Sequence, residues 1–394
     1  MSSSDKPQVL FIAGSGEFGS GECQILDYLQ LPGEKPLVAG LIFPTEGPLV
    51  EQARAAGLEV MVIKGHDYLT DFRELWRQPL AWVYNLGSFV RTSAAIRKKR
   101  VQLVLSLSFI NWTGALAARQ EGVSHVWMIR EVLSGRTNWL NFFWGQWLAS
   151  RLANDLSVRA LLESSLAAEM FRRKRTREKS LILPPAIDTT RFRQQLPERR
   201  PGAPPAEVAL FFSGPNLKRI LETLGVISRV ATSGHGQPAQ PTRVSLFFPG
   251  LKKKRRQALK EKIRREPVPP GLSLQFPDFD CLPAGWIKFR LAVLFPGFDP
   301  LSRVVLESGL AGVPVIVEQG AASELVIPGR TGFIFEHQNY DQLAAGLKEI
   351  LKYPERARQL GLAAREHVER HFDINPWKEK FEGIVAGVLS SAEG

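Results

Sequence analysis

Short apolar runs of strand length alternate with amphipathic stretches of helical spacing along most of the chain. This alternation is typical of a parallel β-sheet whose faces are covered by helices. The first series of predicted strands comprises Val9–Ala13, Leu37–Phe43, Val60–Ile63, Leu103–Leu107, His125–Ile129 and Leu181–Leu183. The second series comprises Ala209–Phe212, Val244–Phe248, Leu272–Phe276, Leu291–Phe295, Val313–Val317 and Gly332–Phe335.

The two series are separated by a segment with the composition of a linker. Residues 196–205 read LPERRPGAPP, and this density of proline and charge disfavours both helix and strand. We therefore predict an N-terminal Rossmann-like domain over residues 1–192, a linker over 193–206 and a C-terminal Rossmann-like domain over 207–372. Ligands of such α/β folds bind beyond the carboxyl ends of the strands, so we expect the site in a cleft between the domains.

The length, the cysteines and the apolar runs narrow the class of protein. A chain of 394 residues is long enough for two domains that each bury a core. The two cysteines, Cys23 and Cys281, lack metal-type spacing and indicate a reducing compartment. No run approaches the roughly 18 apolar residues of a spanning helix, and the start, MSSSDKPQ, lacks the apolar core of a signal peptide. We expect a cytoplasmic protein.

The formal net charge of +12 changes the expected partners. Basic residues are concentrated in three clusters, within 97–100, 172–179 and 252–256. A single cluster of this kind is usually a solvated helix end, but three together favour an anionic partner, meaning a membrane surface, a sugar nucleotide or a nucleic acid. Aromatic residues are not interleaved with the basic runs, as they are in surfaces that bind single strands, so we do not expect a nucleic acid.

The stretch 138–148, NWLNFFWGQWL, predicts a helix that is apolar over most of its circumference. Two interpretations stay open. The helix is either buried against the domain core or lies in the interface of a bilayer, helped by the basic clusters 97–100 and 172–179 of the same domain. The second interpretation predicts a peripheral protein that contacts an anionic membrane surface.

The first predicted strand is followed by Gly14, Gly16 and Gly19 in the spacing G-x-G-x-x-G, which in isolation indicates a dinucleotide site. An NAD-binding unit also needs a carboxylate at the end of the second strand, for the ribose hydroxyls. The strand 37–43 ends without one, and Glu46 lies inside a turn of proline and glycine. An NAD(P)-dependent oxidoreductase is therefore our third hypothesis, and we expect a tight strand–helix turn that faces another phosphate ligand.

The stretch 295–351 carries the most specific chemistry. A strand ends at Phe295, a turn follows, and a helix is predicted over about 302–310 with its first residue as N-cap. The first-turn amides of this helix form an anion site that suits a diphosphate. Asp299 precedes the helix and Glu307 lies within it, and such carboxylates accept hydrogen bonds from sugar hydroxyls.

These residues resemble the donor-binding signature of the family 4 retaining glycosyltransferases, which have the GT-B fold. That family's pattern is E-x7-E, then x-G-x-P-V, G-G-x-x-E and T-G-x-L-V. The similar segments here are DPLSRVVLE at 299–307, AGVPV at 311–315, GAASE at 320–324 and TGFI at 331–334. The resemblance extends to the first domain, where WMIRE at 127–131 is similar to the end of an acceptor-domain strand and LPPAID at 183–188 to the end of that domain.

The resemblance implies two Rossmann-like domains that face each other across a cleft, with a C-terminal helix over 373–394 that crosses back to the first domain. It implies retaining transfer of a sugar from a nucleotide-sugar donor to a glycan or lipid-linked acceptor, in the synthesis of cell-surface polysaccharide or glycolipid. It also implies that no metal or other cofactor is required, because side chains neutralise the leaving diphosphate.

The resemblance further assigns roles to single residues. Asp299 would hold the transferred sugar, and Lys218 or Arg219 would neutralise the leaving diphosphate, a stabilisation that supplies much of the rate. Glu307 would bind the ribose. The other implied substrate-binding residues are Leu301, Ser302, Arg303 and Val304 at the diphosphate, Gly14, Gly16 and Gly19 at the donor phosphate, and Arg130 and Glu131 of the "RE" pair in the acceptor domain.

The chain departs from the family pattern at several of these positions. Asp299 is one methylene shorter than the usual Glu, and Pro215 replaces the arginine of the loop that carries Lys218. Met128 stands where a histidine is common, and a thioether cannot donate a hydrogen bond to a sugar hydroxyl. Gly-Ala at 320–321 replaces Gly-Gly. A catalytically weakened or non-catalytic nucleotide-binding protein of the same fold is therefore our second hypothesis.

Overall fold

The structure of the protein, a computed structural model, divides into two compact units. The first contains residues 1–185 and 374–394, and the second contains residues 186–373. The described residues are 8–17, 19–32, 37–66, 82–131, 151, 154–169, 179–197, 207–214, 216–233, 241–249, 251, 253–277, 283–297 and 301–392. Asp299, Pro215, the apolar stretch 138–148 and most of the predicted linker lie outside these residues.

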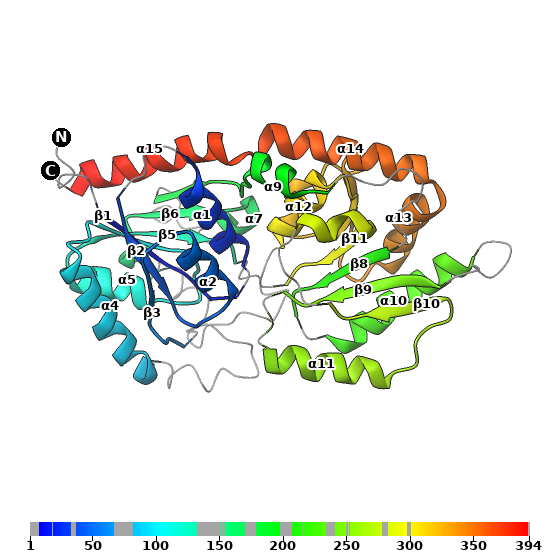
Figure 1. The fold of residues 1–394 in the computed structure, drawn as a ribbon, viewed down its shortest axis with the longest axis horizontal. Coiled ribbons are helices and arrows are strands. Elements are labelled where there is room, and N and C mark those ends of the chain that lie inside the picture. The colour runs from blue at the N-terminus through cyan, green and yellow to red at the C-terminus, as the bar shows by residue number, and fades with distance from the viewer. Residues whose placement is uncertain are drawn as a thin grey trace. The chain divides into compact units, whose positions relative to one another are not determined.

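The first unit is built on a seven-stranded parallel sheet in the order β3-β2-β1-β4-β5-β6-β7 (Figure 1). Its strands are β1 (Gln8–Ile12), β2 (Leu37–Phe43), β3 (Val60–Val62), β4 (Leu103–Ser106), β5 (Ser124–Ile129), β6 (Arg159–Leu162) and β7 (Ser180–Ile182). The order reverses between β1 and β4, which places the topological switch point, where ligands of doubly wound sheets bind, at the carboxyl end of β1.

Helices cover both faces of this sheet. They are α1 (Ser20–Gln30), α2 (Pro48–Ala55), α4 (Leu86–Lys98), α5 (Thr113–Gln120), α7 (Ser165–Ala168) and α15 (Ile374–Ala392). On one face, Leu10 of β1 packs in one apolar cluster with Ala95 of α4 and Ala117 of α5. Side chains alternate along a strand, so the buried Val9 and Phe11 point to the opposite face.

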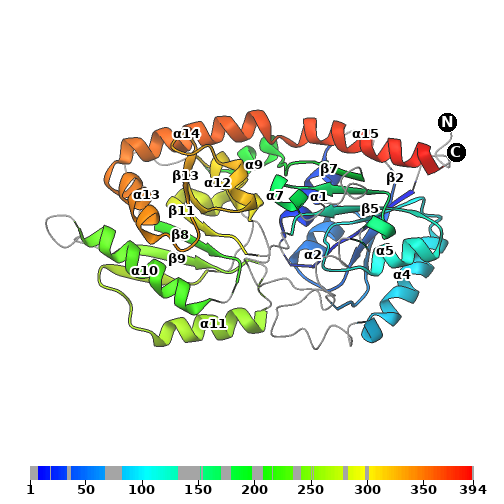
Figure 2. The same ribbon diagram turned by 180° about the vertical axis from the view of Figure 1, so that it is seen from behind.

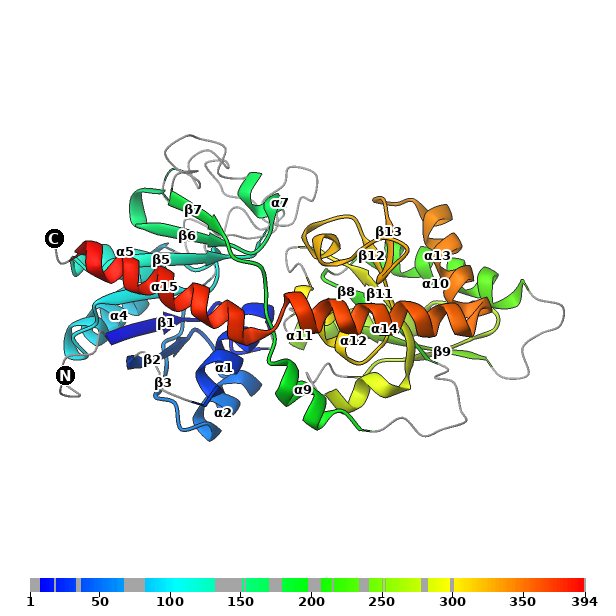
Figure 3. The same ribbon diagram turned by 90° about the horizontal axis from the view of Figure 1, so that it is seen from above.

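Helix α15 belongs to the first unit although it is the last element of the chain. It lies beside α1, as Figure 3 shows. The Tyr28 hydroxyl of α1 donates to Glu382 Oε1 over 3.0 Å, and the Tyr28 ring makes edge contacts with Trp377 and Phe381. Burial and the neighbouring carboxylate raise the pKa of Tyr28 far above its usual value.

The second unit contains a six-stranded parallel sheet in the order β10-β9-β8-β11-β12-β13. Its strands are β8 (Glu207–Phe212), β9 (Thr242–Phe247), β10 (Leu272–Gln275), β11 (Phe289–Phe295), β12 (Val315–Glu318) and β13 (Gly332–Phe335). Every residue of β8 is buried, as expected for a central strand with both faces covered.

The helices of the second unit are α9 (Thr189–Gln195), α10 (Leu217–Thr232), α11 (Lys253–Arg265), α12 (Ser302–Leu310), α13 (Tyr340–Lys352) and α14 (Pro354–His371), with short 3₁₀ helices at Pro283–Lys288 and Ala321–Leu325. Val208, Leu210 and Phe212 of β8 point to the face covered by α10, α11 and α13 (Figure 2). Ala209 and Phe211 belong to a second cluster with α9 and α12.

The division into compact units differs from the predicted domain bounds at the end of the first domain. The first unit ends at Pro185 rather than at residue 192, so α9 belongs to the second unit. Ile187 forms a bridge with Asp373, and its amide donates to the Phe372 carbonyl over 2.9 Å. Phe192 is buried in an apolar cluster of the second unit. The proline-rich composition from which we predicted the linker does not indicate these contacts.

Candidate active site

The carboxyl ends of β8, β11, β12 and β13 lie at one edge of the second sheet, because these neighbouring strands are parallel. At this edge the loops after β8 and β11 run backbone against backbone. The Ser213 amide donates to the Phe295 carbonyl over 3.1 Å, and a Cβ at Gly297 would clash with the Ser213 carbonyl. Only glycine fits such an approach. Ser213, in the loop that precedes both predicted cations, therefore lies beside Gly297, in the loop that follows β11.

Arg219 points across this edge of the sheet. Its amide is fixed at the start of α10, where it donates to the side chain of the N-cap Asn216 over 3.1 Å. The guanidinium lies 4.7 Å from the centroid of the Phe295 ring and forms an ion pair with Glu318 at the end of β12. Arg219 is thus a cation held at the strand ends, where a diphosphate would bind in the predicted mode.

Lys218, the second predicted cation, points to solvent. Its side chain is 85% exposed, and its Nζ lies 3.8 Å from Glu222 Oε1 one turn along α10. Glu222 also accepts a hydrogen bond from the Tyr340 hydroxyl over 2.7 Å. Of the two predicted cations, the structure brings only Arg219 to the carboxyl ends of β11 and β12.

Sequence reasoning missed Glu318 and His337. Glu318 ends β12 and is buried, and its Oε1 contacts both Arg219 and His337 Nδ1, the latter at 3.1 Å. The sequence did carry a signal for Glu318, a glutamate at the last position of an apolar strand. A charged residue is rarely buried without a partner, so this position indicated a nearby cation.

The start of α12 has an unusual backbone. Leu301, rather than the predicted Ser302, is the N-cap, and it has a left-handed conformation with φ of 58°. Its carbonyl accepts from the Val304 amide over 3.0 Å. A non-glycine residue in this region is strained, and such residues cluster at functional sites. Within the predicted Leu301–Val304 anion site, the Val304 amide therefore already has an acceptor.

Glu307 is completely buried within α12. Its Oε1 accepts from Arg303 Nε over 2.8 Å, and its Oε2 accepts from the indole of Trp286 over 3.0 Å. Both oxygens thus have donors from the chain itself. Because Glu307 has no exposed surface, a ribose hydroxyl would reach it only after neighbouring groups moved, and the ribose contact stays a prediction.

In the first unit, the Gly-rich loop after β1 encloses a carboxylate of the chain itself. Glu22, in the first turn of α1, accepts from the Gly14 amide over 2.9 Å, and Gly19 is the N-cap of that helix. A Cβ at Gly19 would clash with the Glu22 carboxylate, whereas one at Gly16 would clash with the Thr45 carbonyl. The glycine spacing therefore meets packing requirements inside the unit, and an anion already lies at the amides of this turn.

Arg130 and Glu131, at the carboxyl end of β5, are also bonded within the first unit. Arg130 Nη2 lies 3.0 Å from Glu22 Oε2. Glu131 accepts from the Phe109 and Arg130 amides over 3.2 Å each, and from the Ser108 hydroxyl. Both side chains are buried, and their direct contact with a substrate stays a prediction.

The strand β5, which leads to this pair, also carries a histidine and a methionine. Met128, where we noted the absence of the family's histidine, is buried. His125 is buried as well, and its Nε2 lies 2.9 Å from the Ser106 hydroxyl. Burial lowers the pKa of His125 to about 3, because the charged imidazolium would lose its hydration.

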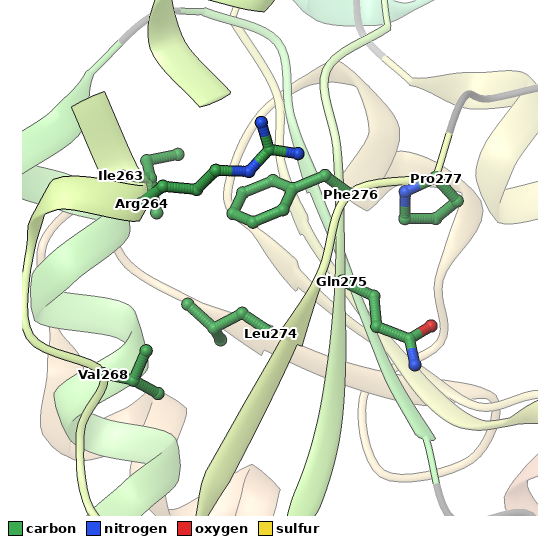
Figure 4. Close-up of a pocket in the computed structure, with 7 residues that line it drawn as sticks. All are labelled: Ile263, Arg264, Val268, Leu274, Gln275, Phe276 and Pro277. Atoms are coloured by element: carbon green, nitrogen blue, oxygen red, sulfur yellow. The ribbon is translucent and has the colours of Figure 1, made fainter. Parts of the chain in front are cut away.

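A hollow of about 610 Å³ lies between α11 and the edge strand β10 (Figure 4). The Arg264 guanidinium stacks over the Phe276 ring there, 5.1 Å from its centroid. The lining residues are Ile263, Arg264, Val268, Leu274, Gln275, Phe276 and Pro277. None of the predicted site residues is among them.

Among the described residues, no group of three or more His, Cys, Asp or Glu side chains is placed to hold a metal ion. Within the same part of the chain, no helix combines the length and the apolar character that crossing a bilayer requires.

Residues 286–367 match the family model of the group 1 glycosyl transferases. The matched range covers 82 of the 394 residues, and it includes β11, α12, β12, β13, α13 and most of α14. It thus contains Glu307, Glu318 and His337.

Two curated mannosyltransferases are similar to part of the chain. The GDP-mannose-dependent alpha-(1-6)-phosphatidylinositol monomannoside mannosyltransferase of Mycolicibacterium smegmatis is 31% identical over 94 residues, which are 24% of this chain and 23% of that protein. The GDP-mannose-dependent monoacylated alpha-(1-6)-phosphatidylinositol monomannoside mannosyltransferase of Corynebacterium glutamicum is 37% identical over 88 residues, 22% of this chain and 23% of that protein. The chain matches about a quarter of the length of these relatives.

Solved structures resemble the chain over almost its whole length. Anabaena Alr3699/HepE, solved with UDP-glucose, has a TM-score of 0.69 and 17% identity, over 96% of this chain and 99% of that chain. A glycosyltransferase from Rickettsia africae has a TM-score of 0.68 and 16% identity, over 98% of this chain and 99% of that chain.

The predicted GT-B class with two Rossmann-like domains is confirmed. The family match and this fold together support a glycosyltransferase.

Proposed function

We propose that the protein is a retaining glycosyltransferase that transfers a sugar from a nucleotide-sugar donor to a glycan or lipid-linked acceptor. The observation that carries the proposal is the match of residues 286–367 to the group 1 glycosyl transferases, within a chain of GT-B fold. HepE was solved with UDP-glucose, and the two curated relatives are GDP-mannose-dependent. A nucleotide-sugar donor is the ligand class that these proteins share.

In the proposed mechanism the donor diphosphate lies at the carboxyl edge of the second sheet. Arg219 is the cation that neutralises the leaving diphosphate, because its guanidinium lies over Phe295 and against Glu318 rather than in solvent. A positive group fixed in advance at the position where charge develops stabilises the transition state. Asp299, which lies outside the described residues, is assigned to the hydroxyls of the transferred sugar on the family resemblance. No step of this scheme requires a metal ion.

A second candidate function has its own support. Each arginine of this region faces a carboxylate of the chain, Arg219 with Glu318 and Arg303 with Glu307. Cations that are already neutralised offer less to a diphosphate, and Pro215 and Asp299 depart from the family pattern. A GT-B protein that binds a nucleotide without turnover is therefore the alternative.

The internal carboxylate at the Gly-rich loop weighs against the third hypothesis, an NAD(P)-dependent oxidoreductase. The Gly14 amide donates to Glu22, so the turn that would hold a dinucleotide pyrophosphate already contains an anion. The strand β2 also ends without an acid for the ribose.

Release of nucleoside diphosphate from UDP-glucose, GDP-mannose and other nucleotide sugars tests the proposal directly. We expect turnover with one donor, and a loss of about a hundredfold or more in kcat for Arg219→Gln. The exposed Lys218→Gln is the matched control and should retain most of the activity. Binding of a nucleoside diphosphate without turnover of any donor, in the presence of glycan and lipid-linked acceptors, would establish the alternative instead.

A further inference from the structure

Four large apolar side chains are exposed at the amino end of α4 and in the helical turn just before it. The exposed fractions are 70% for Val83, 61% for Tyr84, 63% for Leu86 and 55% for Val90. Single exposed apolar residues are ordinary on protein surfaces, but a group of this size within eight consecutive positions marks an interaction surface.

These side chains continue into a basic stripe along the same side of the helix. Positions spaced by three and four residues share one side, and Val83, Leu86, Val90, Ala94 and Lys98 are exposed at this spacing. We define the α4 face as Val83, Tyr84, Leu86, Val90, Arg91, Ala94, Arg97 and Lys98. Over about 22 Å, at 1.5 Å per residue, the α4 face changes from apolar to basic.

The side of α4 opposite to the α4 face packs against the sheet and holds the helix on the unit. Ala95 and Ile96 are buried in the apolar cluster between the helix and the sheet, and Ser88 and Thr92 are buried on the same side. The α4 face is therefore not needed to hold the helix on the unit. Figure 1 shows α4 as one of the helices of the first unit.

The apolar end of the α4 face is fixed by hydrogen bonds. Asn85 is buried, accepts from the His66 amide over 2.7 Å and donates to the His66 carbonyl over 2.9 Å. The Ser88 hydroxyl donates to the Lys64 carbonyl. The exposed apolar side chains thus stand on a rigid helix start, so little ordering is needed when a partner binds.

The charge of the basic end identifies the partner. Arg91, Lys98 and the neighbouring Arg100 are exposed, and Arg97 stays 65% exposed although it contacts Glu121 over 2.9 Å. Exposed apolar side chains next to exposed arginine and lysine on one surface suit an anionic bilayer, because the apolar groups can enter the interface while the cations meet lipid phosphates. An aromatic hydroxyl such as that of Tyr84 suits the level of the head groups.

We propose that the α4 face binds the surface of an anionic lipid bilayer. Val83, Leu86 and Val90 enter the boundary between head groups and acyl chains, while Arg91 and Lys98 pair with lipid phosphates. Helix α11 provides the contrast within the same molecule. It is more basic than α4, yet its exposed positions carry no large apolar side chain. This proposal does not depend on the proposed catalytic activity.

Sedimentation with sucrose-loaded vesicles tests the proposal. The wild-type chain is expected to bind vesicles of phosphatidylglycerol and phosphatidylcholine in equal parts, and to bind vesicles of phosphatidylcholine alone much less. The triple variant Val83→Ser, Leu86→Ser, Val90→Ser should lower the bound-to-free ratio about tenfold or more. The pair Arg91→Gln, Lys98→Gln should lower it on the anionic vesicles.

Two matched control variants remove charges or exposed apolar side chains from surfaces other than the α4 face. Lys253→Gln with Lys254→Gln removes two charges from α11, and Tyr353→Ser with Leu362→Ser removes two exposed apolar side chains from the second unit. Both controls should bind as the wild type does, and thermal unfolding should confirm that every variant folds.

Three results would overturn the proposal. In the first, the α4 variants bind vesicles as well as the wild type does. In the second, the α11 pair loses as much binding as the α4 pair. In the third, the wild type does not bind anionic vesicles and self-associates through the α4 face. The second result would mean that net charge alone attracts the protein. The third, seen by analytical ultracentrifugation, would make the α4 face a protein interface.

Discussion

The Arg130 guanidinium lies 3.0 Å from the Glu22 carboxylate, measured from Nη2 to Oε2, with both side chains buried in the first unit. The other Glu22 oxygen accepts from the Gly14 amide. A Cβ at Gly21 would lie 2.5 Å from the Arg130 Cζ. The Gly-rich turn is thus shaped around an internal ion pair, with the carboxylate at the helix start where other folds hold a phosphate.

This relationship predicts strong coupling between the two side chains. Removing one partner of a buried ion pair leaves an uncompensated charge and costs about 3–5 kcal/mol. We expect Arg130→Met and Glu22→Gln each to lower the free energy of unfolding by an amount of this order, measured by chemical denaturation. The double variant should lose at least about 1 kcal/mol less than the sum of the single losses. Additive losses would show that the pair does not stabilise the turn as a unit.

The close approach of the loops after β8 and β11 predicts an effect of Gly297→Ala. A methyl group at this position meets the Ser213 carbonyl, so the two loops have to separate. We expect loss of nucleotide binding together with a lower melting temperature. Gly225→Ala in α10 is the matched control, because a Cβ there meets nothing within 4 Å. That variant should be stabilised by about 0.5–1 kcal/mol, as expected for alanine in a helix interior. Nucleotide binding by Gly297→Ala at wild-type affinity would contradict the geometry.

The strands were largely predictable from the sequence, because each consists of a short apolar run between polar or turn residues. Leu37–Phe43 and Gly332–Phe335 match their predicted bounds, and α12 occupies the predicted range 302–310. The strand β6 was missed, because its four residues begin with the exposed Arg159. The N-cap of α12 was also misplaced, since a left-handed Leu301 has no local sequence signal.

The site was less predictable than the fold. The sequence indicated the two cations and the helix α12, but Glu22 and Arg130 are 108 residues apart, and Glu318 lies 99 positions after Arg219. Local patterns do not show which distant charges are brought together. A buried glutamate also looks the same in sequence whether it binds a ribose or, like Glu307, accepts from Trp286 and Arg303.

The buried His125 predicts a loss of stability in acid. Burial lowers its pKa from 6.5 to about 3, so between these values the unfolded chain binds a proton that the folded chain does not. Stability should therefore fall as the pH drops below 6.5, by about 2 kcal/mol from this group between pH 7 and pH 5. The difference between wild type and His125→Gln, measured by denaturation across this range, isolates the contribution. Parallel pH profiles for the two proteins would show that His125 is not kept neutral by burial.

We propose that the second unit binds a nucleoside diphosphate through Arg219. Calorimetric titration with UDP, GDP, ADP, dTDP and NADH, on the wild type, Arg219→Gln and Lys218→Gln, tests it most directly. Because Arg219→Gln leaves Glu318 buried without its arginine, the pair Arg219→Gln, Glu318→Gln is titrated as well.

We expect one nucleoside diphosphate to bind the wild type, and we expect NADH not to bind. Affinity should fall about tenfold or more, or about 1.4 kcal/mol, in both variants that lack Arg219, because a charge-assisted contact to the diphosphate is lost. Lys218→Gln should bind nearly as the wild type. Binding of NADH, or nucleotide affinity that is unchanged without Arg219, would contradict the account.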